Sequence, residues 1–163
     1  MRNRLAAFAV VLLLAMAGCS PAADSGQTDL FRYKGSYVGD NSAVGNIVER
    51  LPGSKDFRGM ELKTAEEPYG IVLRYAPEEG MAPGEVYERL FYNAAFLFAL
   101  VSNAEWIEFQ YGDQSVKVTR DALEDRYGTD LRRFSSEEEL DTFLKERLKD
   151  VLSEPPVPLP AER

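Results

Sequence analysis

The stretch that decides the fold is residues 85–118, EVYERLFYNAAFLFALVSNAEWIEFQYGDQSVKV. Apolar residues recur at helical spacing from residue 85, and residues 94–101 are apolar on every side, which predicts a long central helix buried in a core. This stretch of eight apolar residues is too short to span a membrane. Residues 107–111 then alternate between apolar and polar, Gly112-Asp113 predicts a turn, and Val116 and Val118 resume the alternation. A β-hairpin therefore follows the helix.

A second hairpin is predicted before the central helix. Residues 60–64 alternate with period two, and residues 69–75 form a second alternating run, in which Arg74 lies on the polar face. A short helix is expected between Asp40 and Pro52, one more after Thr119, and a last one from Ser136, where Glu139 completes a capping box, to Leu152. Because a hairpin cannot bury one face alone, we expect an α+β domain over residues 30–152. In this domain an antiparallel sheet of about four strands, made of the two β-hairpins, packs against helices.

The N-terminus has the pattern of a secretory signal peptide over residues 1–18. Arg2 and Arg4 precede an apolar run, which ends in small residues. Met16-Ala17-Gly18-Cys19 resembles the lipobox of bacterial lipoproteins, and this resemblance implies cleavage before Cys19 and a thioether-linked diacylglycerol with palmitate-like chains. The expected location is the extracytoplasmic face of the cell membrane. Residues 19–29 are then the lipidated cysteine and a flexible spacer with a reach of ~17 Å, and residues 153–163 a Pro-rich disordered tail.

Composition excludes several classes of function. Without residues 1–18 the chain has 17 basic and 27 acidic residues, a net charge of −10, so it lacks the basic patch that nucleic acid needs. There is no histidine, and Cys19 is the single cysteine. A Ser-His-Asp or Cys-His arrangement is therefore excluded, and we expect no disulfide, no metal site and no cofactor.

Several motifs along the chain resemble one family. They are Tyr37-Val38-Gly39-Asp40-Asn41-Ser42, Glu61-Leu62-Lys63-Thr64, Glu67-Pro68-Tyr69-Gly70 and Asn93-Ala94-Ala95, and they resemble the family called domain of unknown function 4825, over about residues 30–148. The resemblance implies an extracytoplasmic lipoprotein, or a domain attached to a membrane sensor peptidase. Family likeness by itself does not establish a function.

Five residues are candidates for contact with a partner or ligand. Glu67 and Tyr69 lie in a loop that could recognise a ligand, although proline and glycine there are equally typical of a tight hairpin connection, which we favour. Asp40 and Asn41 could contact a metal or a polar ligand, but helix capping explains them better. Trp106 falls on the face opposite Ile107, where it could anchor a partner or cover one end of the core.

Two functions from different classes remain open. The first is a non-enzymatic, membrane-tethered interaction or sensing domain of the bacterial envelope, whose partner is an envelope protein or a membrane sensor. The second is a small hydrolase of cell-wall glycans that depends on carboxylates, with Glu67, Glu105 and Glu108 as first candidates. We favour the first, because the sequence contains no recognisable catalytic set.

Overall fold

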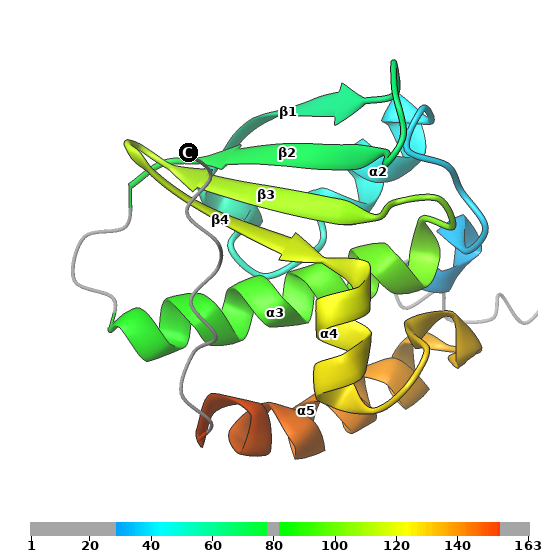
Figure 1. Ribbon diagram of the computed structural model, residues 1–163, viewed down its shortest axis with the longest axis vertical. Coiled ribbons are helices and arrows are strands. Elements are labelled where there is room, and N and C mark those ends of the chain that lie inside the picture. Colours follow the sequence, from blue (N-terminus) through cyan, green and yellow to red (C-terminus); the bar gives the residue numbers. More distant parts are fainter. Residues whose placement is uncertain (1–28, 78–81, 154–163) are drawn as a thin grey trace, which may run out of the picture.

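The computed structural model describes residues 29–77 and 82–153, in which helices cover one side of a four-stranded sheet (Figure 1). The predicted helices and strands are all present. The strands are β1 (Phe57–Lys63), β2 (Gly70–Tyr75), β3 (Trp106–Tyr111) and β4 (Gln114–Thr119). The helices are α2 (Asn41–Val48), α3 (Pro83–Leu100), α4 (Arg120–Tyr127) and α5 (Glu137–Ser153), with 3-10 turns η1 (Leu30–Tyr33), η2 (Ser54–Asp56) and η3 (Leu131–Arg133).

The sheet is mixed, so the expectation of a purely antiparallel sheet is wrong. Its order is β1-β2-β3-β4, and both predicted hairpins, β1 with β2 and β3 with β4, are antiparallel. The two central strands, however, run parallel, with Gly70 opposite Trp106 and Tyr75 opposite Tyr111. The cause is α3, which carries the chain back along the sheet, so that β3 begins at the same end as β2 (Figure 1).

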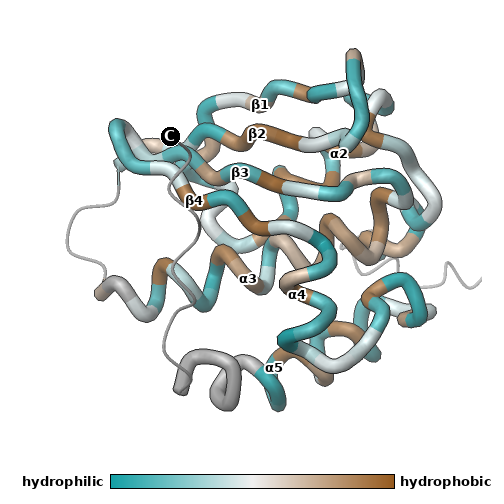
Figure 2. Tube along the Cα trace, in the orientation of Figure 1, coloured by the Kyte–Doolittle hydropathy of each residue, from teal (hydrophilic) through white to brown (hydrophobic). Residues whose placement is uncertain are grey.

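The core lies between the inner face of the sheet and α3. Ile71, Leu73, Ile107 and Phe109 are fully buried on that face. Residues 94–101, which form the end of α3 and its C-cap, are buried along their whole length, as predicted. Figure 2 shows the hydrophobic residues gathered in the central strands and in α3. Phe91, nearer the start of α3, is partly buried and packs against this core. The buried residues of the described core all lie between positions 30 and 144, so this stretch contains a core of its own.

The helix ends follow the predicted capping, with one shift. Thr119 caps α4 through the amide of Ala122, and Gly128 ends this helix at a φ of 68°. Ser136 Oγ accepts from the amide of Glu139 at 3.2 Å, but the Glu139 carboxylate binds the amide of Ser135 rather than that of Ser136. Ser136 therefore makes its half of the predicted capping box, whereas the carboxylate of Glu139 binds the residue before Ser136.

The signal peptide, Cys19 and most of the spacer lie outside the described residues, as does the tail from residue 154. Among the described helices, none is both long enough and apolar enough to cross a membrane.

Candidate functional site

Two of the predicted contact segments meet at one end of the sheet. Because β2 and β3 are parallel, the loop that precedes β2 and the residues that precede β3 lie side by side. The indole Nε1 of Trp106 donates to the carbonyl of Pro68 at 2.9 Å, and the amide of Glu105 donates to the carbonyl of Tyr69 at 2.9 Å. The structure thus brings Glu67, Tyr69 and Trp106 into one region. We call residues 37–41, 64–70 and 103–106 the contact end.

Both faces of the Trp106 ring are occupied by the protein itself. A Cβ placed on Gly70 would lie 2.1 Å from Cε2 of the indole, so the ring rests directly on the backbone of β2. The ammonium group of Lys117 lies 4.3 Å from the ring centre, in a cation–π contact. Trp106 is on the outer face of the sheet, as predicted, and is partly exposed. Because the ring is packed against β2, only its edge is accessible to a partner.

The segment with Asp40 and Asn41 joins the contact end from the other side. The amide of Val38 donates to Asn103 Oδ1 at 2.7 Å, and a Cβ on Gly39 would meet Thr64 at 4.0 Å. Asp40 accepts from the amide of Ala43 at 2.9 Å, so the capping interpretation is confirmed for Asp40. Asn41 is the first residue of α2 and is exposed.

Sequence reasoning missed Tyr37. It has 61% of its surface exposed and is the one exposed large hydrophobic residue among the side chains that the structure describes. It lies in a short loop between η1 and α2, where no periodic pattern distinguishes an exposed tyrosine from a buried one. The family-like motif at residues 37–42 therefore presents an aromatic side chain to solvent.

The three candidate carboxylates fall in two places. Glu67 and Glu105 are exposed at the contact end, on backbone segments joined by the Tyr69–Glu105 hydrogen bond. Glu108 is two residues into β3, where it accepts from Gln110 at 2.7 Å and lies opposite Lys117 in the strand pairing.

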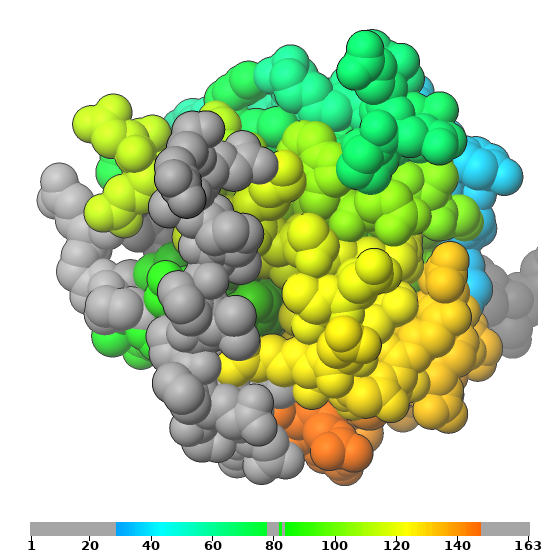
Figure 3. Space-filling model, viewed as in Figure 1, coloured from blue at the N-terminus to red at the C-terminus, as the bar shows by residue number. Residues whose placement is uncertain are grey.

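The outer face of the sheet forms part of the surface of the molecule (Figure 3). On it, Glu61 binds both Lys63 and Arg74, the latter at 2.9 Å. Lys63, and to a lesser degree Arg74, hold the pKa of the Glu61 carboxyl below its ordinary value. Because all three side chains are about half exposed, these ion pairs contribute little to stability.

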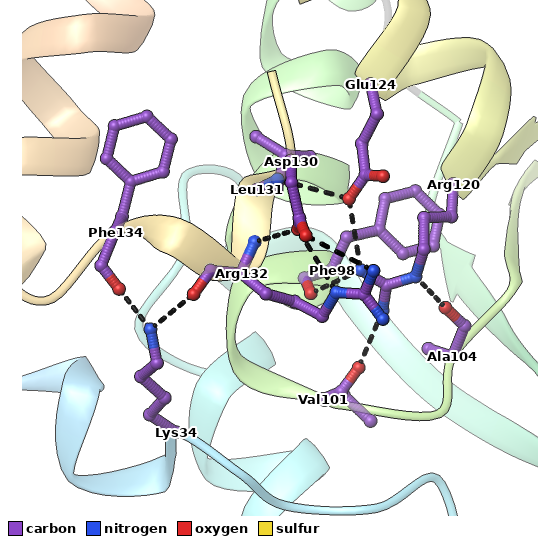
Figure 4. Close-up of polar contacts among 10 residues, drawn as sticks. All are labelled: Lys34, Phe98, Val101, Ala104, Arg120, Glu124, Asp130, Leu131, Arg132 and Phe134. Carbon is purple, nitrogen blue, oxygen red and sulfur yellow. Dashed lines mark hydrogen bonds and ion pairs between the residues drawn. The ribbon is translucent and has the colours of Figure 1, made fainter.

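Behind the contact end, the buried side chain of Arg120 closes the C-terminus of α3 (Figure 4). Its guanidinium donates to the carbonyls of Phe98, Val101 and Ala104, each at 2.9 Å. Phe98 lies in the last turn of α3, where a helix leaves its carbonyl groups unpaired, whereas Val101 and Ala104 lie in the segment that follows. Burial lowers the pKa of Arg120, and nearby Glu124 opposes that shift. Nothing in the sequence distinguished this arginine from those on the surface.

Glu124 links the arginine to the chain that follows. Its carboxylate lies 3.4 Å from Arg120 and accepts from the amide of Leu131 at 3.1 Å, which fixes η3 against α4 (Figure 4). Lys34 in turn donates to the carbonyls of Arg132 and Phe134. A hydrogen bond from Arg132 holds the pKa of Asp130 below its ordinary value. This network ties the N-terminal turn to the last third of the domain.

Among residues 29–77 and 82–153, no cluster of three or more acidic, histidine or cysteine residues could hold a metal ion. One family comparison gives a match: the sequence model described as Domain of unknown function (DUF4825) matches residues 30–121. The match covers the sheet, α2, α3 and the start of α4, and ends earlier than the resemblance at residue 148 suggested. No curated protein and no solved structure matches the chain.

Proposed function

We propose that this chain, which belongs to the DUF4825 family, is a membrane-tethered lipoprotein of the bacterial envelope that binds a partner without catalysing a reaction. The lipobox-like sequence ending at Cys19 supports the tether. The partner contact is assigned to the contact end. The observation that carries it is the hydrogen bond from Trp106 to Pro68, which holds the family-like loop of residues 67–70 against the start of β3.

A rigid end is suited to recognition, because little conformational freedom is lost when a partner binds. The loop of residues 64–69 is fixed at its base by the Trp106 indole and by the pairing of Lys63 with Gly70. Exposed Glu66 and Glu67 and the partly buried Tyr69 then offer charge and aromatic surface together. Tyrosine is enriched where proteins contact one another.

Site-specific photocrosslinking in native membranes tests this proposal. A benzophenone amino acid at Glu67 is expected to give a discrete crosslinked product with an envelope protein. The matched control is the same amino acid at Lys55, which is also exposed but lies in η2, at the opposite end of β1. No product from Glu67, or the same products from both positions, would contradict a partner at the contact end.

A further inference from the structure

The point at which the tether reaches the domain is rigid. Asp29 caps η1 by accepting from the amide of Phe31 at 2.8 Å, and the amide of Leu30 donates to Glu137 Oε2 at 2.7 Å. Leu30 and Phe31 are buried. Any chain that enters from the spacer therefore does so at a fixed position. We call the surface next to this point, made of Arg32, Tyr33, Lys34, Tyr37 and Arg50, the entry face.

Tyr37 is held outward on the entry face by a paired backbone. The amide of Gly35 donates to the carbonyl of Leu100 at 3.0 Å, and the amide of Ser102 donates to the carbonyl of Ser36 at 2.8 Å. One residue later, Val38 is fully buried. The exposure of the tyrosine is thus a feature of an anchored turn, since the residues on both sides of it are fixed to the end of α3.

Cations surround the second tyrosine of this face. The guanidinium carbons of Arg32 and Arg50 lie 5.0 and 5.6 Å from the centre of the Tyr33 ring, and Arg50 also donates to the Tyr33 hydroxyl at 3.2 Å. Both arginines are exposed. Their charged groups are therefore positioned at the surface and still accessible from outside.

The charge is unevenly distributed along the chain. Residues 29–50 contain three basic and three acidic residues, whereas residues 51–163 contain 14 basic and 23 acidic residues, a net charge of −9. Close to an anionic surface, the electrostatic repulsion of such a domain is weakest when residues 29–50, whose net charge is zero, face that surface. The entry face lies on that segment. Two of the three acidic residues there, Asp29 and Asp40, are engaged in capping helices.

We propose that the entry face docks on the anionic lipid headgroups of the membrane to which Cys19 is anchored. Arg32 and Arg50 contact lipid phosphates, and Tyr37 sits at the headgroup level, where tyrosine is favoured. This inference rests on the tether in the proposed function. The spacer expected from the sequence over residues 19–29 would reach ~17 Å, which would keep the entry face within contact distance of the surface.

The test uses the chain from Cys19 onward, which includes the whole described core. Its single thiol is coupled to a maleimide lipid in vesicles of phosphatidylcholine, with or without phosphatidylglycerol. Enzymatic iodination of Tyr37, mapped by mass spectrometry, reports whether the entry face is covered. We expect iodination of Tyr37 to be slower on the anionic vesicles and to recover in high salt.

Two double variants with the same loss of charge separate docking from general electrostatics. Arg32→Gln with Arg50→Gln is expected to weaken docking by about fivefold for each cation removed and so to restore iodination. Lys55→Gln with Arg58→Gln, both exposed and at the other end of β1, leaves Tyr37 protected.

Equal iodination of Tyr37 on both kinds of vesicle overturns the proposal, and so does recovery in the control variant. A protein surface as the occupant of the entry face would give the first of these results, because the vesicles contain no other protein. Since the lipid is attached chemically, the outcome does not depend on lipidation of Cys19 in cells.

Discussion

At the scale of single residues, Trp106 and Arg120 each hold distant segments of the chain together at the same end of the molecule. Trp106 joins the two central strands on the outer face, through Gly70 and Pro68. Arg120 closes α3 on the inner side by binding three carbonyl groups. Each contact joins positions at least 16 residues apart in the chain, so local sequence patterns contain no signal for them. The candidate site could therefore be predicted only as separate motifs.

Arg120→Met is expected to lower the free energy of unfolding by about 3–5 kcal/mol, because it leaves buried carbonyls and Glu124 without their partner. Urea denaturation monitored by circular dichroism measures the loss. The control is Arg132→Gln, which breaks an ion pair whose side chains are about half exposed and should cost less than about 1 kcal/mol. A loss at Arg120 no larger than that of the control would contradict the role given to this residue.

Gly70→Ala tests the contact of the indole with β2. The new methyl group has no room under the Trp106 ring, so the ring must move outward, at a cost of about 1–3 kcal/mol. Since Trp106 is the single tryptophan, its fluorescence emission should shift to longer wavelength. Gly84→Ala, where a Cβ meets open space, is the matched control. An unchanged emission spectrum in Gly70→Ala would show that the ring does not rest on this glycine.

At the scale of elements, periodicity was sufficient for the helices and strands but not for their pairing. The two hairpins were predictable because short turns at residues 64–69 and 112–113 force adjacent strands to be antiparallel. The parallel pairing of β2 with β3 depends on the path of α3, whose length matches the sheet. That path is a tertiary property. The burial of residues 94–101 was predictable, and Phe91, nearer the start of α3, is partly buried against the core.

Phe98→Ala is expected to reduce stability by ~3–5 kcal/mol, because the side chain is fully buried and its removal leaves a cavity beside the sheet. The same substitution at Phe91, which is on the same helix but half-buried, should cost clearly less. Thermal and urea unfolding of the two variants compare them directly. Equal losses would mean that the two halves of α3 are buried to the same extent.

At the scale of the whole molecule, the proposed tether determines which surfaces of the domain lie near the membrane. The stretch from Leu30 to Leu144 contains its own core, and the described chain begins at a rigid point close to the contact end and the entry face. A tether at that point would keep both surfaces near the membrane. The address could be predicted from the sequence alone, because signal peptides act as linear patterns, and it stays a prediction. The surfaces could not be predicted in this way, because they are assembled from segments far apart in the chain.

Lipid attachment at Cys19 is the central claim, and metabolic labelling with a fatty-acid probe tests it most directly. Cells that express the full chain should incorporate the probe into the wild-type protein and move it to the membrane fraction. Cys19→Ser removes the one thiol of the chain and should abolish labelling. Ser20→Cys in the Cys19→Ser background, which displaces the thiol by one position, is a control for the spacing of the motif. Probe incorporation that persists in Cys19→Ser, or that is absent from the wild type, would contradict the account.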